Sequence, residues 1–229
     1  MTWPTPVPGG AAQPGTEPGE AEAYRILRSR IDLSRLPKYS RDVTERIIYA
    51  TADFDYATDL VCDEEALAGA VDALAGGARV VADTTMVAAG ITGCPVVCKI
   101  GETLTARLAR TAGISRPAAA VRLAFGDVGP GAVWVVGGEP AALTEILYRG
   151  VEPAFVVGMP VGFVAAAEAK DALRASGIAS VSNVSEKGGA AVATAAFDAL
   201  LRSAVTMSGS RAAGAAGAAT GKAPPEDGR

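Results

Sequence analysis

The sequence predicts an α/β fold, in which a five-stranded, mostly parallel sheet lies between layers of helices. Three observations support this prediction. Five short runs of β-branched and other apolar residues recur along the chain, and longer segments with helical periodicity separate them. The runs are apolar without alternation, as in strands that are buried on both faces. Strands that alternate with helices in this way are typical of a parallel sheet.

The expected strands and helices follow one another through the middle of the chain. The strands are expected at residues 79–82, 96–100, 132–136, 154–157 and 180–184. The helices are expected at residues 64–75, 103–112, 140–148, 165–176 and 188–203. In the first of these helices, Leu67, Val71 and Leu74 recur at a spacing that keeps one helical face apolar. A helical lead from about residue 20 to 57 precedes the sheet, with a break expected at Pro37, because proline disfavours helix at the residue before it.

The two ends of the chain differ in composition from the middle. Residues 1–19 contain five prolines, which block regular structure. Residues 208–229 are rich in alanine and glycine and then read Pro-Pro-Glu-Asp, with no large apolar residue to anchor them. We therefore expect disordered tails at residues 1–19 and 208–229, and one folded α/β domain at residues 20–207.

Composition argues against several classes of function. The formal net charge is −4 and no Lys/Arg run is present, so nucleic acid is not an expected partner. No signal peptide is recognisable and no run approaches the ~18 apolar residues of a membrane span, which predicts a cytoplasmic protein. Cys62, Cys94 and Cys98 are the only cysteines and histidine is absent. We interpret the cysteines as small apolar residues and do not expect a metal site.

Four distinctive segments, three of which contain glycines, follow the expected strands; we call the sheet edge where they would meet the glycine-rich edge. They are Asp83–Met86, Gly137–Pro140, Gly158–Phe163 and Ser185–Gly189. In an open parallel sheet these segments meet at the carboxyl edge, where ligands bind. Glycine lets a backbone approach a ligand closely, and the following helix N-termini attract anions. Together the segments predict a site for a ligand with several carboxylates, although ordinary turn chemistry is the better explanation of any one segment taken alone. None of them matches a nucleotide-binding motif.

Two further segments carry polar groups among apolar residues. Arg116 precedes an expected helix, with Pro117 at its first position, and could clamp a carboxylate or simply be solvated. Tyr49 and Tyr56 follow a helix, and a core or interface tyrosine pair is one interpretation of them.

The order of these blocks resembles the precorrin-8X methylmutase family from about residue 20 to 201. The matching blocks are Tyr24–Leu36, Arg46–Thr51, Asp83–Ile91, Ser115–Arg116, Gly158–Val164, Glu168–Lys170 and Lys187–Gly189. The string Gly-Met-Pro-Val-Gly-Phe-Val at residues 158–164 is the most specific of them. The resemblance implies a flavodoxin-like α/β/α domain, a homodimer with sites near its interface, and no cofactor or metal. It also implies the family reaction, a methyl shift from C-11 to C-12 of a corrin precursor that gives hydrogenobyrinate.

The resemblance further implies which residues form the site. Tyr49 stands where the family has a functional histidine that donates to the ring system. Catalytic roles are implied for Tyr49 and Arg116. The implied substrate-binding residues are Ala23, Arg28, Thr84, Thr85, Ser115, Gly137, Gly138, Met159, Pro160, Gly162, Lys187, Gly188 and Gly189. The free pKa of tyrosine, about 10, is far above the value of about 6.5 for histidine, so tyrosine is the weaker acid at neutral pH.

This chain also departs from the family pattern at several small polar positions. Ala23, Pro117, Ala169 and Ala190 replace serines, and Glu139 adds a negative charge. Three functions therefore stay open. The chain is a working methylmutase, a repurposed paralogue acting as an isomerase or pericyclase on a less anionic substrate, or a non-catalytic binding protein.

Overall fold

The computed structural model describes residues 18–219, with side chains described at residues 19–210. The strands are β1 (Leu60–Cys62), β2 (Val80–Ala82), β3 (Val96–Val97), β4 (Val133–Val136), β5 (Phe155–Gly158) and β6 (Ser180–Asn183). The helices are α1 (Pro18–Arg30), α2 (Lys38–Thr51), α3 (Tyr56–Asp59), α4 (Glu64–Ala75), α5 (Thr85–Gly90), α6 (Thr103–Ala112), α7 (Arg116–Val128), α8 (Pro140–Arg149), α9 (Ala166–Ala175) and α10 (Ala190–Ala219). Residues 1–17 of the predicted N-terminal tail lie outside the described residues.

The sheet is mostly parallel, as expected, and its order is β1-β6-β5-β4-β2-β3. The five parallel strands follow a doubly wound order in which the direction of winding reverses between β2 and β4. The prediction of five strands was wrong by one, because β1 pairs antiparallel with β6 at the edge of the sheet. β1 has three residues, too few to show a strand pattern, and it is held by pairing with β6 rather than by a local signal.

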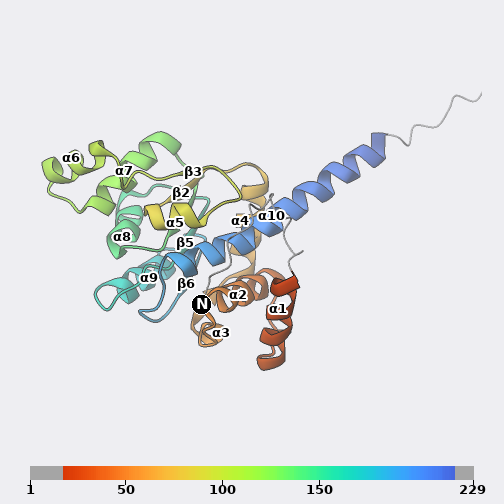
Figure 1. The fold of residues 1–229 in the computed structure, drawn as a ribbon. Coiled ribbons are helices and arrows are strands. Elements are labelled where there is room, and N and C mark those ends of the chain that lie inside the picture. Colours follow the sequence, from red (N-terminus) through yellow and green to blue (C-terminus); the bar gives the residue numbers. More distant parts are fainter. Residues whose placement is uncertain (1–17, 220–229) are drawn as a thin grey trace, which may run out of the picture.

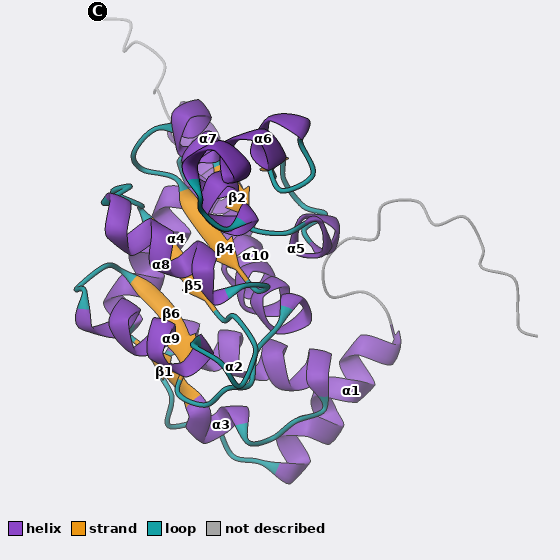
Figure 2. Ribbon diagram, turned by 90° about the vertical axis from the view of Figure 1, so that its left-hand side faces the viewer, coloured by secondary structure: helices purple, strands orange, loops and turns teal. Residues whose placement is uncertain are grey.

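Helices cover both faces of the sheet, which confirms the predicted three-layer architecture (Figures 1 and 2). Alternate residues of β4 show the division. Val133 and Val135 belong to a core shared with α2, α4 and α10. Trp134 and Val136 belong to a second core shared with α7, α8 and α9. β4 thus buries side chains on both faces, which explains its continuous apolar run.

Helix boundaries differ from expectation mainly near the two ends of the chain. The first helix ends at Arg30, and Pro37 precedes α2 as its N-cap instead of ending a helix. The last helix continues to Ala219, past residue 208, where we expected disorder to begin. Alanine has the highest intrinsic helix propensity, which suits this extension. Figure 1 shows the end of α10 projecting beyond the rest of the domain.

The stretch Ala190–Ser210 of α10 is long and apolar enough to cross a membrane by length and composition alone. Its Ala193, Phe197 and Leu200 side chains are instead buried in the core against the sheet and α2. Burial of one face inside a domain is the ordinary reason for such a helix, and we interpret α10 as a core helix.

Candidate functional site

The carboxyl ends of β2 and β4 meet at the point where the strand order reverses. Asp83 follows β2, and its two carboxylate oxygens accept hydrogen bonds from the backbone amides of Gly137 and Gly138, at 3.2 and 2.8 Å. Burial raises the pKa of Asp83, and the amides of Gly138 and Gly137 oppose that rise. A Cβ at Gly138 would overlap Thr84, the N-cap of α5. Glycine is therefore needed here for the close approach of two segments.

The segments after β5 and β6 lie against each other at the same edge. The amide of Gly189 donates to the Met159 carbonyl at 2.9 Å, and the amide of Gly162 donates to the Glu186 carbonyl at 3.1 Å. Gly188 has a φ of +149°, and a Cβ there would overlap the Met159 carbonyl oxygen. A Cβ at Gly137 would lie 3.0 Å from the Gly189 carbonyl oxygen. The segments after β5 and β6 therefore pack against the segment after β4.

The structure thus brings most of the predicted substrate-binding residues together at one edge of the sheet, the glycine-rich edge. These residues are Thr84, Gly137, Gly138, Met159, Pro160, Gly162, Gly188 and Gly189. Thr85 follows Thr84 and is exposed. The expectation that these segments converge follows from parallel topology, and the topology is present.

Lys187 lies within the segment Ser185–Gly189 at this edge, and its ammonium group is already paired with two carboxylates. Its ammonium pairs with Asp53 at 2.8 Å and with Asp55 at 2.6 Å, and it lies 5.9 Å from the ring centre of Tyr56. The hydrogen bonds that Lys187 donates to Asp53 and Asp55 raise its pKa. Burial raises the pKa of Tyr56 to about 12. These ion pairs tie the segment that follows α2 to the glycine-rich edge.

A buried polar cluster, which the sequence did not reveal, supports the segment after β6. The Lys170 ammonium is fully buried and donates to Asn183 Oδ1 at 3.0 Å, to the Lys187 carbonyl at 2.8 Å, and to the Ser185 carbonyl. Three acceptors match the three donors of an ammonium group. Asn183 in turn donates to Asp59 at 2.9 Å. Burial lowers the pKa of Lys170 to about 8, which leaves it mostly charged at pH 7.

Tyr49 and Ala23 meet elsewhere, between α1 and α2. Together with Ile26, Leu27 and Phe54 they line a cavity of about 230 Å³. The Tyr49 side chain is 38% exposed, and no hydrogen-bond partner for its hydroxyl is found among residues 19–210. Tyr49 and Tyr56 do not form the pair suggested by the sequence. Instead, Tyr49 stacks on Tyr24, with ring centres 5.1 Å apart and planes 5° apart.

Arg28 lies on α1 beside the stacked tyrosines, with its guanidinium carbon 5.5 Å from the ring centre of Tyr24, whereas Ser115 and Arg116 lie at the start of α7. Arg28 makes a bidentate ion pair with Glu45, in which Nε and Nη2 of Arg28 donate to the two carboxylate oxygens at 2.9 and 2.7 Å. Ser115 caps α7, and Arg116 is exposed in the first turn of that helix rather than before it. Glu139 is exposed as the N-cap of α8.

Exposed apolar side chains flank the glycine-rich edge. Phe163 is 92% exposed, Val164 82% and Met86 72%, and Val161 is also exposed. Met86 lies in α5, directly after Thr85, and the other three lie between β5 and α9. Large apolar side chains that gather on a surface are characteristic of an interface. We call these four residues the apolar rim.

Comparison with known proteins relates the chain to one family along nearly the whole domain. The family model for precorrin-8X methylmutase matches residues 20–203. The cobalt-precorrin-8 methylmutase of Salmonella typhimurium is 39% identical over 195 residues, covering 80% of this chain and 92% of that protein. The cobalt-precorrin-8 methylmutase of Methanocaldococcus jannaschii is 35% identical over 163 residues, covering 69% and 77%. A solved precorrin-8X methylmutase from Thermus thermophilus superposes with a TM-score of 0.75 at 32% identity, covering 82% of this chain and 96% of that one.

Proposed function

Because the chain belongs to the precorrin-8X methylmutase family, we propose that it is an isomerase of cobalamin biosynthesis, which moves a methyl group from C-11 to C-12 of precorrin-8X to give hydrogenobyrinate. The observation that carries the proposal is family similarity along residues 20–203, including the segment 158–164 with its distinctive sequence. The substrate is accordingly a small-molecule tetrapyrrole. Since the reaction is a rearrangement within one molecule, it needs no redox partner and no group donor.

We assign the role of hydrogen-bond or proton donor to Tyr49. Its side chain is partly exposed at the wall of a cavity, and its hydroxyl has no partner within the described residues, so it is available to a ligand. The ion pairs of Lys187 with Asp53 and Asp55 support the role, because they connect the end of α2 to the glycine-rich edge. General acid help contributes roughly 10²–10⁴-fold in rate. A phenol, as the weaker acid, supplies the lower part of that range.

The glycine-rich edge is proposed to hold the macrocycle. Close backbone approach at Gly138 and Gly188 places backbone rather than bulky side chains beside the ligand. Arg116, exposed at the start of α7, is assigned to a peripheral carboxylate of the substrate. Lys187 is not assigned to a carboxylate, because two aspartates already neutralise it.

We further propose a homodimer in which the apolar rim is covered by a second copy. Phe163 and Val164 are almost fully exposed beside the glycine-rich edge, so a second copy there would lie near the site. The protein is proposed to act in the cytoplasm, where its cysteines would stay reduced.

The experiment is conversion of precorrin-8X by the purified protein, with hydrogenobyrinate identified by chromatography as a product of unchanged mass. We expect Tyr49→Phe to lower kcat by roughly 100-fold, because the donor is lost. Tyr49→His should raise kcat above that of the starting protein. The matched control is Tyr148→Phe, which removes the hydroxyl of an 80% exposed tyrosine on α8 and should change nothing.

Two outcomes contradict the proposal at different levels. Absence of hydrogenobyrinate with the unsubstituted protein and with Tyr49→His would refute the methylmutase activity and favour the repurposed paralogue. Turnover by Tyr49→Phe at the rate of the unsubstituted protein would refute the role of Tyr49 alone.

A further inference from the structure

The Tyr49 ring is covered on one face by two groups. Tyr24 stacks on it, and the Arg46 guanidinium carbon lies 5.0 Å from the centre of the Tyr49 ring. Arg46 Nη1 also lies 3.5 Å from the hydroxyl oxygen of Tyr24. A guanidinium on the opposite face would be separated from Tyr24 by the thickness of the Tyr49 ring. Arg46 and Tyr24 therefore lie side by side against the same face.

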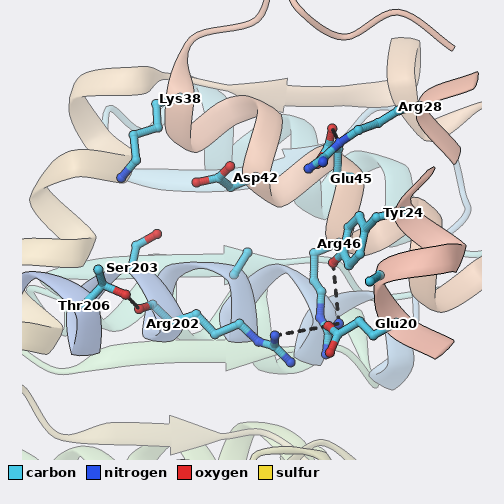
Figure 3. A pocket seen from close by; sticks show the side chains of 12 residues that line it. Glu20, Tyr24, Arg28, Lys38, Asp42, Glu45, Arg46, Arg202, Ser203 and Thr206 are labelled. Carbon is cyan, nitrogen blue, oxygen red and sulfur yellow. Dashed lines mark hydrogen bonds and ion pairs between the residues drawn. The ribbon is translucent and has the colours of Figure 1, made fainter. Parts of the chain in front are cut away.

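Arg46 is itself held in place by two carboxylates from different helices. Its Nη1 contacts Glu20 of α1 at 2.9 Å, and its Nε contacts Asp198 of α10 at 2.8 Å. The Arg46 side chain is only 18% exposed, so these pairs are shielded from solvent more than surface pairs are. Figure 3 shows Arg46, Tyr24 and Glu20 converging at one end of a cavity of about 520 Å³.

Arg202 uses the same two carboxylates without touching the aromatic pair. It contacts Glu20 at 3.1 Å and Asp198 at 2.8 Å. Among the described side chains, no ring contact of Arg202 is found, whereas Arg46 contacts both Tyr24 and Tyr49. The two arginines therefore share the same carboxylate partners, and of the two only Arg46 contacts Tyr49.

We propose that Arg46 is a positioning residue for Tyr49: its guanidinium, anchored by Glu20 and Asp198, holds the Tyr49 ring from one side, so that the hydroxyl meets the substrate from a fixed position. This inference rests on the proposed function for its catalytic consequence. The geometric part stands on the contacts alone. A cation against an aromatic face is attracted by the ring quadrupole, and the attraction also fixes the distance between them. A misplacement of about 1 Å can cost a catalytic group about 10²-fold in rate.

The geometric part is tested without substrate, by ¹⁹F NMR of protein labelled with 3-fluorotyrosine. The chain has five tyrosines, and the Tyr49 resonance is the one missing from Tyr49→Phe. We expect Arg46→Met to shift and broaden that resonance. Arg202→Met should leave it in place although it breaks ion pairs to the same carboxylates, and Arg46→Lys should restore part of the original shift. An unchanged Tyr49 resonance in folded Arg46→Met overturns the inference.

The catalytic part is tested by a double-mutant cycle on kcat. If Arg46 acts through the Tyr49 hydroxyl, Arg46→Met lowers kcat by roughly 10-fold in the unsubstituted protein but has no further effect in Tyr49→Phe. A merely structural role would lower kcat equally in both backgrounds, and that result overturns the proposal. Arg202→Met should keep kcat within about 2-fold, since Tyr49 keeps its support.

The two experiments separate failure of this inference from failure of the proposed function. A shifted ¹⁹F resonance in a protein that converts no precorrin-8X leaves Arg46 as the support of Tyr49 and removes only the methylmutase activity. An unshifted resonance in an active protein keeps the activity and removes the role of Arg46. Far-ultraviolet circular dichroism of each variant identifies any that fails to fold, and Arg46→Lys then replaces Arg46→Met in both tests.

Discussion

Substitution of Gly188 by alanine should destabilise the protein for two separable reasons. At a φ of +149° an L-residue is strained, which costs about 1–3 kcal/mol. The added Cβ would also overlap the Met159 carbonyl oxygen and lie 2.8 Å from that of Pro160. Both neighbours are backbone and cannot rotate away, so overpacking adds about 1–3 kcal/mol. The Met159 carbonyl also accepts the hydrogen bond from Gly189, so its displacement weakens that bond as well. The total expected loss is about 2–6 kcal/mol.

Gly162 provides a matched control for the strain alone. Its φ is +143°, nearly that of Gly188, but nothing lies within 4 Å of a Cβ built on it. Urea unfolding of Gly162→Ala and Gly188→Ala should therefore differ by about 1–3 kcal/mol in the free energy of unfolding, with equal m-values. If Gly188→Ala loses no more stability than Gly162→Ala, the close packing of the segments after β5 and β6 is refuted.

Two further predictions concern buried groups. Asp83→Ala leaves the amides of Gly137 and Gly138 without their acceptor, so it should lower the free energy of unfolding, measured in urea, by about 2–4 kcal/mol. Asp83→Asn should lower it by less. A loss below about 0.5 kcal/mol for Asp83→Ala would contradict the hydrogen-bonding role of Asp83. Burial raises the pKa of Cys62 from 9.0 to about 12, so above pH 9 the unfolded thiol ionises while the native thiol keeps its proton, and alkali favours unfolding. Between pH 9 and 10.5 the unsubstituted protein should lose roughly 1–2 kcal/mol more stability than Cys62→Ala, and parallel pH profiles of the two would rule out the buried thiol.

The main elements of the fold could be predicted from sequence because their signals are local. The helices at residues 64–75 and 103–112 have the boundaries that their patterns indicated. The strand at residues 133–136 is apolar at every position because both of its faces are covered. Convergence of the glycine-rich segments also followed, since parallel strands end at the same edge of a sheet.

Local sequence patterns did not predict contacts between residues that are far apart in the chain. From the sequence, Lys187 was expected to bind the substrate. In the structure its charge is neutralised in part by Asp53, which lies 134 residues away in sequence. The stretch Leu60–Cys62 becomes a strand only because the edge of β6 is beside it.

The layered α/β architecture, the family and the presence of Tyr49 follow from the sequence, because composition, periodicity and motif order are local properties of the chain. The surroundings of Tyr49 follow from the tertiary structure alone. Its neighbour Arg46 is anchored from α1 and α10 by Glu20 and Asp198, residues that are far apart in the chain. Their meeting depends on how helices pack around a common core, and no local pattern records that packing.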